Sequence, residues 1–313
     1  MCKLFMIAGI TNETRNKAWE LTIEMAGIMG ETMRDGIGYA AVTESGELFG
    51  ERWHKSEEAF DVRGEVIQET QVEKRIKSSF GKALTMREKP KRYNSFGDEF
   101  SCIEDLCDTT AAIALHGRFA TSSRDFKNTH PFVVDDTSLV HNGVIRNADK
   151  LNRMKQSTCD SEVILNLYNE KQVSRWASNI QGVVDELRGY FACGVFTRDA
   201  DGNRVMDIFK DDTAQLFAAY IKELSTIVFV TNVSDLELAC EIADLTIDSV
   251  FKVEAGNLIR LNPVTGVVTS ITDFDHSLAS QQVVSTWAAM RDRGNQDVDS
   301  DGFAVDLDKV LGL

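Results

Sequence analysis

Short apolar runs separated by turn-forming residues are the feature that most limits how this chain can fold. From residue 182 onward such runs alternate with turns, of which Asp201-Gly202-Asn203 is typical. Apolar runs of this length, bounded by turn residues, indicate strands. The strands that we expect cover residues 1–10, 38–43, 48–53, 110–115, 138–141, 190–198, 205–210, 227–231, 258–262 and 267–271. Many short strands with few helices between them predict packed sheets covered by helices.

Helices are expected at four places. Apolar residues recur with helical spacing between residues 16 and 33, and helices are also expected over 148–155 and 161–169. Ser234 and Glu237 have the S-x-x-E spacing of a capping box, which predicts a helix that runs to Ala243. Residues 55–105 are highly charged with little alternation, and we interpret them as a mostly helical surface insertion.

Charge and composition exclude several classes of protein. The 313 residues carry a formal net charge of −15, which argues against a nucleic-acid partner, because phosphate recognition needs a basic surface. A hydrophobic content of 43% is that of an ordinary globular protein. No apolar run is long enough to span a membrane, and the first residues lack the pattern of a signal peptide, so we expect a cytoplasmic protein.

The six cysteines do not form a recognisable framework. They are spread over a long chain, which makes a set of disulfides the weaker interpretation. No pair of CxxC motifs occurs, so the spacing does not predict a zinc site either.

Cys2 is the most informative of these cysteines. The initiator methionine is normally removed before a residue as small as cysteine, and removal would leave a thiol and a free α-amine on one residue. The amine, with an ordinary pKa near 8, can accept the thiol proton, and the thiolate is the nucleophile. A Met-Cys start is weak evidence when taken alone.

Three downstream segments strengthen that interpretation. They read H-G-R-F-A-T from His116, H-N-G from His141 and C-D-S-E-V-I from Cys159. In this order after a terminal cysteine, they closely resemble the class II glutamine amidotransferases, whose members include the glutaminase domain of glucosamine-6-phosphate synthase. The resemblance covers roughly residues 2–262. It implies an α+β fold: the four-layer αββα sandwich of the N-terminal-nucleophile hydrolases, with two packed antiparallel sheets and helices outside.

The resemblance also implies catalytic roles. Cys2 would attack the side-chain amide of glutamine and form a thioester. Asn142, through its side-chain NH₂, and Gly143, through its backbone N–H, would form the oxyanion hole. An ordinary type I′ turn at Asn142-Gly143 is the structural alternative.

Three further residues would bind the substrate by the same resemblance. Arg118 would pair with the α-carboxylate of glutamine, to which Thr121 could add a hydroxyl contact, and Asp160 would receive the α-ammonium. The structural alternatives are a surface ion pair for Arg118 and a helix N-cap for Asp160. We interpret three histidines near these motifs as structural, since a terminal amine removes the need for a histidine base: His116, His130 and His141.

We expect residues 1–272 to form the amidotransferase domain, including the insertion at 55–105, and residues 273–313 to form a short acidic tail. No metal or other cofactor is expected in the catalytic site. Aspartates at 297, 299 and 301, Gly302 and Asp308 match most of a calcium-binding loop, for which a solvated acidic tail is the alternative.

The chain after Asn262 offers no phosphate-binding loop or sugar-isomerase pattern, so an ammonia acceptor is expected on another polypeptide. A homo-oligomer is compatible with the sequence. Two other functions stay open: an N-terminal-nucleophile hydrolase of a γ-glutamyl or other amide, and a non-catalytic subunit that keeps the fold.

Overall fold

The structure is a computed structural model that describes residues 2–33, 35–53, 76–77, 83–84, 109–119, 126–151, 155, 157–171 and 176–279. Most of the insertion at 55–105, Thr121 and the calcium-like loop at 297–308 lie outside the described residues. The last described strand ends at Asp273.

Two antiparallel sheets form the centre of the fold. The first has the order β13-β11-β12-β1-β6-β2-β3 and the second the order β15-β14-β10-β9-β8-β7. The strands of the first sheet are β1 (Lys3–Ala8), β2 (Gly36–Thr43), β3 (Leu48–Trp53), β6 (Thr110–Arg118), β11 (Phe217–Ile221), β12 (Thr226–Val230) and β13 (Ile247–Lys252). Those of the second are β7 (Phe132–Val134), β8 (Thr137–Ile145), β9 (Gly189–Arg198), β10 (Arg204–Lys210), β14 (Asn257–Leu261) and β15 (Val268–Asp273). A separate pair, β4 (Ile76–Lys77) and β5 (Ala83–Leu84), lies within the insertion.

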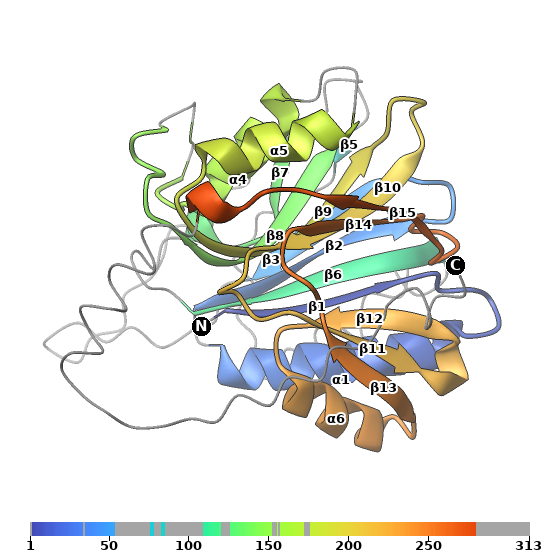
Figure 1. The fold of residues 1–313 in the computed structure, drawn as a ribbon. Helices are drawn as coiled ribbons and strands as arrows, with labels where there is room; N and C mark the ends of the chain where they lie inside the picture. The colour runs from blue at the N-terminus through green and yellow to red at the C-terminus, as the bar shows by residue number, and fades with distance from the viewer. Residues whose placement is uncertain are drawn as a thin grey trace, which may run out of the picture.

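Helices cover the outer face of each sheet (Figure 1). α1 (Arg15–Thr32) and α6 (Val233–Ile242) pack on the first sheet, and α4 (Ser161–Glu170) and α5 (Trp176–Glu186) lie over the second. A third apolar cluster fills the space between the sheets. The predicted αββα sandwich is therefore confirmed in the described part of the chain.

Alternation along the central strands separates these apolar layers. On β1, Leu4 and Met6 lie in the core between the sheets, whereas Phe5 and Ile7 pack towards α1. Because side chains alternate with a period of two, each residue's layer follows from its parity. This rule places residue 2 on the same face as Leu4, towards the second sheet.

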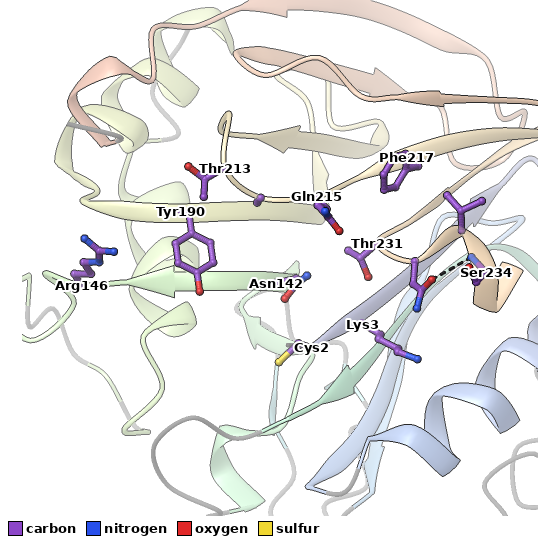
Figure 2. Close-up of a pocket in the computed structure, with 13 residues that line it drawn as sticks. Cys2, Lys3, Asn142, Arg146, Tyr190, Thr213, Gln215, Phe217, Thr231 and Ser234 are labelled. Atoms are coloured by element: carbon purple, nitrogen blue, oxygen red, sulfur yellow. Dashed lines mark hydrogen bonds between the residues drawn. The ribbon is translucent and has the colours of Figure 1, made fainter. Parts of the chain in front are cut away.

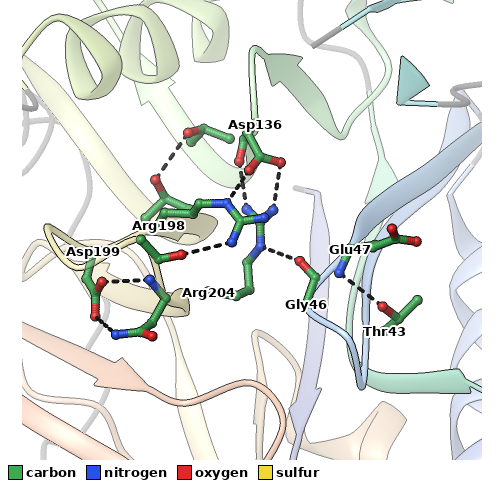
Figure 3. Close-up of polar contacts among 11 residues, drawn as sticks. Thr43, Gly46, Glu47, Asp136, Arg198, Asp199 and Arg204 are labelled. Carbon is green, nitrogen blue, oxygen red and sulfur yellow. Dashed lines mark hydrogen bonds and ion pairs between the residues drawn. The ribbon is translucent and has the colours of Figure 1, made fainter. Parts of the chain in front are cut away.

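Arg198 and Arg204 form a polar cluster with Asp136 that links the two sheets at one end (Figure 3). Arg204 binds the carboxylate of Asp136 at 2.6 Å, donates to the Asp136 carbonyl at 2.7 Å and donates to the Gly46 carbonyl at 3.1 Å. It thereby joins the β2–β3 turn to the β7–β8 turn. Arg198 pairs with the other oxygen of Asp136 at 2.5 Å. The strand register places this cluster at the far end of both sheets from residue 2.

Several predicted elements differ from those observed. Strands were predicted to end near residues 115 and 141, but β6 continues to Arg118 and β8 to Ile145, because their polar residues are buried. No helix forms over residues 148–151, which are turns, and 152–154 lie outside the description. The described residues of the insertion form β4 and β5 rather than helix. The capping-box prediction placed the N-cap at Ser234, whereas Asn232 caps α6 by accepting from the Ser234 N–H at 3.0 Å.

Candidate active site

Strand parity brings three of the predicted site residues into the space between the sheets. Lys3 pairs with Gly117 on β6, so the next pair along the antiparallel ladder is Cys2 with Arg118. Arg118 has the parity of Ala112 and Ala114, which lie in the core between the sheets. Asn142 on β8 likewise has the parity of Val140, which lies in the same core.

Cys2 directly precedes β1 and is half-buried as a residue. The Phe119 N–H donates to Cys2 Sγ at 3.5 Å. Burial raises the pKa of the thiol, while the Phe119 backbone and the charge of Arg118 act to lower it and Asp160 adds to the rise. The thiol is therefore protonated at neutral pH and needs a base before it can act as a nucleophile.

Asn142 and Gly143 are not in a turn, which excludes the structural alternative for them: both lie inside β8, paired with β9. Phe191 on β9 is the partner of Gly143. Its N–H donates to the Asp211 side chain and its carbonyl accepts from the Asp211 N–H, so both groups point away from β8. Gly143 therefore occupies a position of the ladder that is not hydrogen-bonded, with its N–H pointing away from β9. On that side β7 pairs with β8 only as far as Leu139, so in the described structure no strand covers the Gly143 N–H.

Glycine is required at position 143 by close packing. A Cβ there would lie 2.1 Å from the carbonyl oxygen of Tyr190 and 2.6 Å from Nε2 of His141. Since the nearest obstacle is backbone, any larger residue would displace β8 from β9. The glycine thus lets β8 stay paired with β9 beside Asn142, which lines the same cavity as Cys2.

Arg118 and Asp160 are both close enough to Cys2 to affect the pKa of its thiol. Arg118 is buried, with 4% of its surface exposed, which excludes a surface ion pair. Asp160 occupies the N-cap position of α4, but its side chain makes no capping hydrogen bond. Its Oδ2 instead accepts from the Ile145 N–H at 2.6 Å, which ties the start of α4 to the end of β8.

The three histidines form a buried cluster, in which His141 directly precedes Asn142 on β8. The rings of His116 and His130 stack with centroids 3.9 Å apart, and His116 Nε2 lies 3.0 Å from the His141 carbonyl. His141 Nδ1 lies 2.8 Å from the Ser161 hydroxyl. Burial lowers the pKa of all three, that of His116 to about 3, so the cluster is neutral at physiological pH. Its contacts connect β6 and β8 to α4.

A cavity of about 850 Å³ opens beside Cys2 (Figure 2). Of the predicted site residues, Cys2 and Asn142 line it, whereas the described residues Gly143, Arg118 and Asp160 do not. The rest of the wall was not predicted from the sequence; it consists of Lys3, Arg146, Tyr190, Thr213, Ala214, Gln215, Phe217, Thr231, Asn232, Val233 and Ser234. These residues come from the ends of strands far apart in the sequence and share no motif. The only sequence feature that could have pointed to them is the presence of polar residues next to predicted strand ends.

The described residues contain no group of three or more His, Cys, Asp and Glu side chains placed to hold a metal ion. Within the same ranges, no helix combines the length and apolar character needed to cross a bilayer.

Comparisons with known proteins agree with this geometry. Residues 116–237 match a family described as a glutamine amidotransferase domain. The structure resembles the glutamine phosphoribosylpyrophosphate amidotransferase from B. subtilis in complex with ADP and GMP, with a TM-score of 0.52 and 16% identity over 83% of this chain and 47% of that one. It also resembles a structure described as the allosteric regulatory enzyme of purine biosynthesis, with a TM-score of 0.54 and 15% identity over 87% of this chain and 48% of that one. No curated protein matches the chain.

The comparisons agree with the resemblance to class II glutamine amidotransferases: residues 116–237 match a glutamine amidotransferase domain, and the two similar structures, at 15–16% identity, share the fold. The family match begins at His116 and does not include Cys2, and the chain spans about half the length of the two similar structures.

Proposed function

We propose that this protein hydrolyses the side-chain amide of glutamine through a thioester on Cys2. The observation that carries the proposal is the position of Cys2 and Asn142. They come from opposing sheets, Cys2 directly before β1 and Asn142 on β8, and both line one cavity. A nucleophile and a hydrogen-bond donor that converge on one space are what an acyl-transfer site requires.

The base is the α-amine that Cys2 gains when Met1 is removed. The thiol is protonated at neutral pH because burial raises its pKa. An α-amine with an ordinary pKa near 8 lies on the same residue and takes the thiol proton as the sulfur attacks the amide carbon. The buried histidines cannot serve in its place, because their own lowered pKa values leave them poor proton acceptors.

The reaction then has two balanced steps. Attack forms the C–S bond and a tetrahedral oxyanion, which the Asn142 amide and the Gly143 N–H stabilise. The C–N bond breaks, and the leaving nitrogen takes the proton from the α-ammonium and departs as ammonia. Water, with the α-amine as base, then attacks the thioester; glutamate leaves and the thiol is restored.

Arg118 and Asp160 bind the amino-acid end of glutamine in this proposal. Their opposite charges suit an α-carboxylate and an α-ammonium. Both side chains are near Cys2, since burial raises the pKa of its thiol while Arg118 acts to lower it and Asp160 adds to the rise. Thr121, which lies outside the described residues, adds a hydroxyl contact to the carboxylate.

We further propose that the ammonia passes to an acceptor enzyme on another chain. The described residues form the αββα fold and no second unit beside it. In this proposal the catalytic site needs no cofactor. Calcium binding at 297–308, self-association and a cytoplasmic location remain expectations from the sequence.

The test is ammonia release from glutamine by the wild-type protein and by Cys2→Ala, with intact-mass measurement to establish that Met1 is absent. Cys193→Ala, which removes a buried free thiol away from the cavity, is the matched control. We expect release by the wild type and the control but not by Cys2→Ala. Equal release by all three, or none from the wild type even with cell extract added to supply a partner, would refute the proposal.

A further inference from the structure

The cavity beside Cys2 is much larger than hydrolysis of glutamine requires. Ammonia is about as large as water, whose share of liquid volume is about 30 Å³, so ammonia would use a small part of a cavity of about 850 Å³. Pockets of roughly 300–1,000 Å³ hold complete small molecules. The remaining volume is therefore large enough to hold a leaving group much larger than ammonia.

The position of the cavity indicates which part of a substrate it holds. Arg118 and Asp160, which bind the amino-acid end under the proposed function, do not line it, whereas Cys2 and Asn142 do. A substrate held by Arg118 and Asp160 with its side-chain amide carbon at Cys2 would direct the group beyond the scissile bond into this cavity. The cavity thus lies on the leaving-group side of the reacting amide.

The wall is suited to a polar occupant. Tyr190 is half-buried, and Thr213, Gln215 and Ser234 expose hydroxyl and amide groups. None of the lining residues is acidic within the described part of the chain, although the whole protein carries a net charge of −15.

The wall of the cavity carries two cations. Lys3 is neutralised by Asp235 at 2.5 Å, and Asp235 itself is not part of the wall. Arg146 is exposed directly after β8 and lies beside Tyr190: burial raises the pKa of Tyr190, and the charge of Arg146 acts to lower it. A guanidinium at this position favours a carboxylate on the occupant.

The loop that carries much of this wall is held rigidly. Asp211 is fully buried and its Oδ1 accepts from the backbone N–H groups of Phe191 and Ala214, both at 3.0 Å. These bonds fix Thr213 and Ala214 against β9. The cavity is therefore a preformed site, as small-molecule sites usually are.

We propose that the cavity binds the amine portion of a γ-glutamyl peptide, and that the enzyme cleaves such γ-amides, releasing an amino acid in place of ammonia. This inference rests on the proposed function of Cys2. The C–N bond of the γ-amide breaks as the thioester forms, and the leaving amine takes the proton that ammonia takes in glutamine hydrolysis. Water then releases glutamate as before.

The test measures glutamate release from glutamine, γ-glutamylglycine and γ-glutamylmethylamide by the chain freed of Met1. We expect kcat/KM for γ-glutamylglycine to be at least equal to that for glutamine and above that for the methylamide, which lacks the carboxylate. Hydrolysis of glutamine alone would overturn this inference and leave the proposed function standing. Hydrolysis of γ-glutamylglycine alone would support the inference and overturn the glutaminase assignment, and hydrolysis of no substrate would overturn both.

Two variants locate the effect in the cavity. Arg146→Gln should lower the preference for γ-glutamylglycine over the methylamide by roughly tenfold, since it removes a charge-assisted contact. Gln215→Trp, which fills the cavity from an exposed position, should lower the ratio of kcat/KM for γ-glutamylglycine to that for glutamine by about tenfold or more. Val267→Trp, at an exposed turn that does not line the cavity, is the matched control. Unchanged ratios in both cavity variants would contradict the proposed location.

Discussion

A buried charge cluster in the second sheet allows a detailed prediction, because it fixes the helix that carries Asp160. Asp207 on β10 is fully buried, and Arg260 on β14 binds both of its oxygens, at 2.8 and 3.0 Å. The hydroxyl of Tyr168, on α4, donates to the same carboxylate at 2.6 Å. α4 begins directly after Asp160, so this contact sets the position of a proposed substrate ligand.

The expected loss of stability follows from these contacts. Arg260→Met removes the cation and leaves Asp207 buried without its charge partner, which should cost about 3–5 kcal/mol of unfolding free energy. Tyr168→Phe removes one hydrogen bond to a charged acceptor and should cost about 1.5–3 kcal/mol. Because both act on one carboxylate, the effects in the double variant should not add.

Urea unfolding followed by circular dichroism measures these losses, with a constant m-value as the check that only stability has changed. Arg198→Met is the matched control, because Arg198 pairs with an aspartate while its own side chain is 42% exposed. The control should cost no more than about 1 kcal/mol. If Arg260→Met cost no more than Arg198→Met, the interpretation of Asp207 as a buried charge held by its partners would be wrong.

Three further predictions concern the site. Asn142→Ala should lower kcat for glutamine by roughly 10²–10³-fold with little change in KM, as expected for a lost oxyanion donor; a change in KM alone would contradict that role. Arg118→Ala should instead raise KM by roughly 10- to 100-fold, since it removes a charged contact made before the reaction; steady-state kinetics would contradict this if only kcat fell. Burial lowers the pKa of His116 in the folded protein to about 3, whereas in the unfolded chain this histidine has an ordinary pKa of about 6.5. As the pH falls, the unfolded chain therefore binds the proton first, and the free energy of unfolding decreases below about pH 6.5. Urea unfolding should show a loss of about 2 kcal/mol from this histidine between about pH 7 and about pH 5, absent in His116→Gln; equal pH dependence in both proteins would refute it.

Local patterns were enough to predict most of the strands and α1. Short apolar runs bounded by turn residues predicted β9, β10 and β14 to within a residue at their ends. The same reasoning ended β6 and β8 too early, since His116 and His141 are polar and were expected at strand ends. Both are buried in a cluster that only the packed fold assembles, and such long-range burial leaves no local signal.

Other elements were missed because their patterns are weak. β11 and β13 lie at one edge of the first sheet, and the short β7 at an edge of the second. α5 was likewise not predicted from the sequence. At α6 the capping-box spacing predicted Ser234 as the N-cap, but asparagine caps helices as well as serine does, and Asn232 forms the cap.

The candidate site was predictable only as far as its motifs. The motifs pointed to Cys2, Asn142 and Arg118, and strand parity now places all three side chains between the sheets. The cavity wall could not be predicted, because Tyr190 and Gln215 reach it from separate strand ends that meet only in three dimensions. Thr121 lies outside the described residues, so its role stays a prediction.

The central claim is that Cys2 carries the acyl group, and locating that group tests it most directly. The chain freed of Met1 is mixed with glutamine, quenched in acid during turnover and mapped by peptide mass spectrometry. We predict a γ-glutamyl group on the N-terminal cysteine of the wild type, and slower formation of this group during the first turnover in Asn142→Ala. An active enzyme that still retains Met1, or a γ-glutamyl group on any residue other than Cys2, would contradict the account.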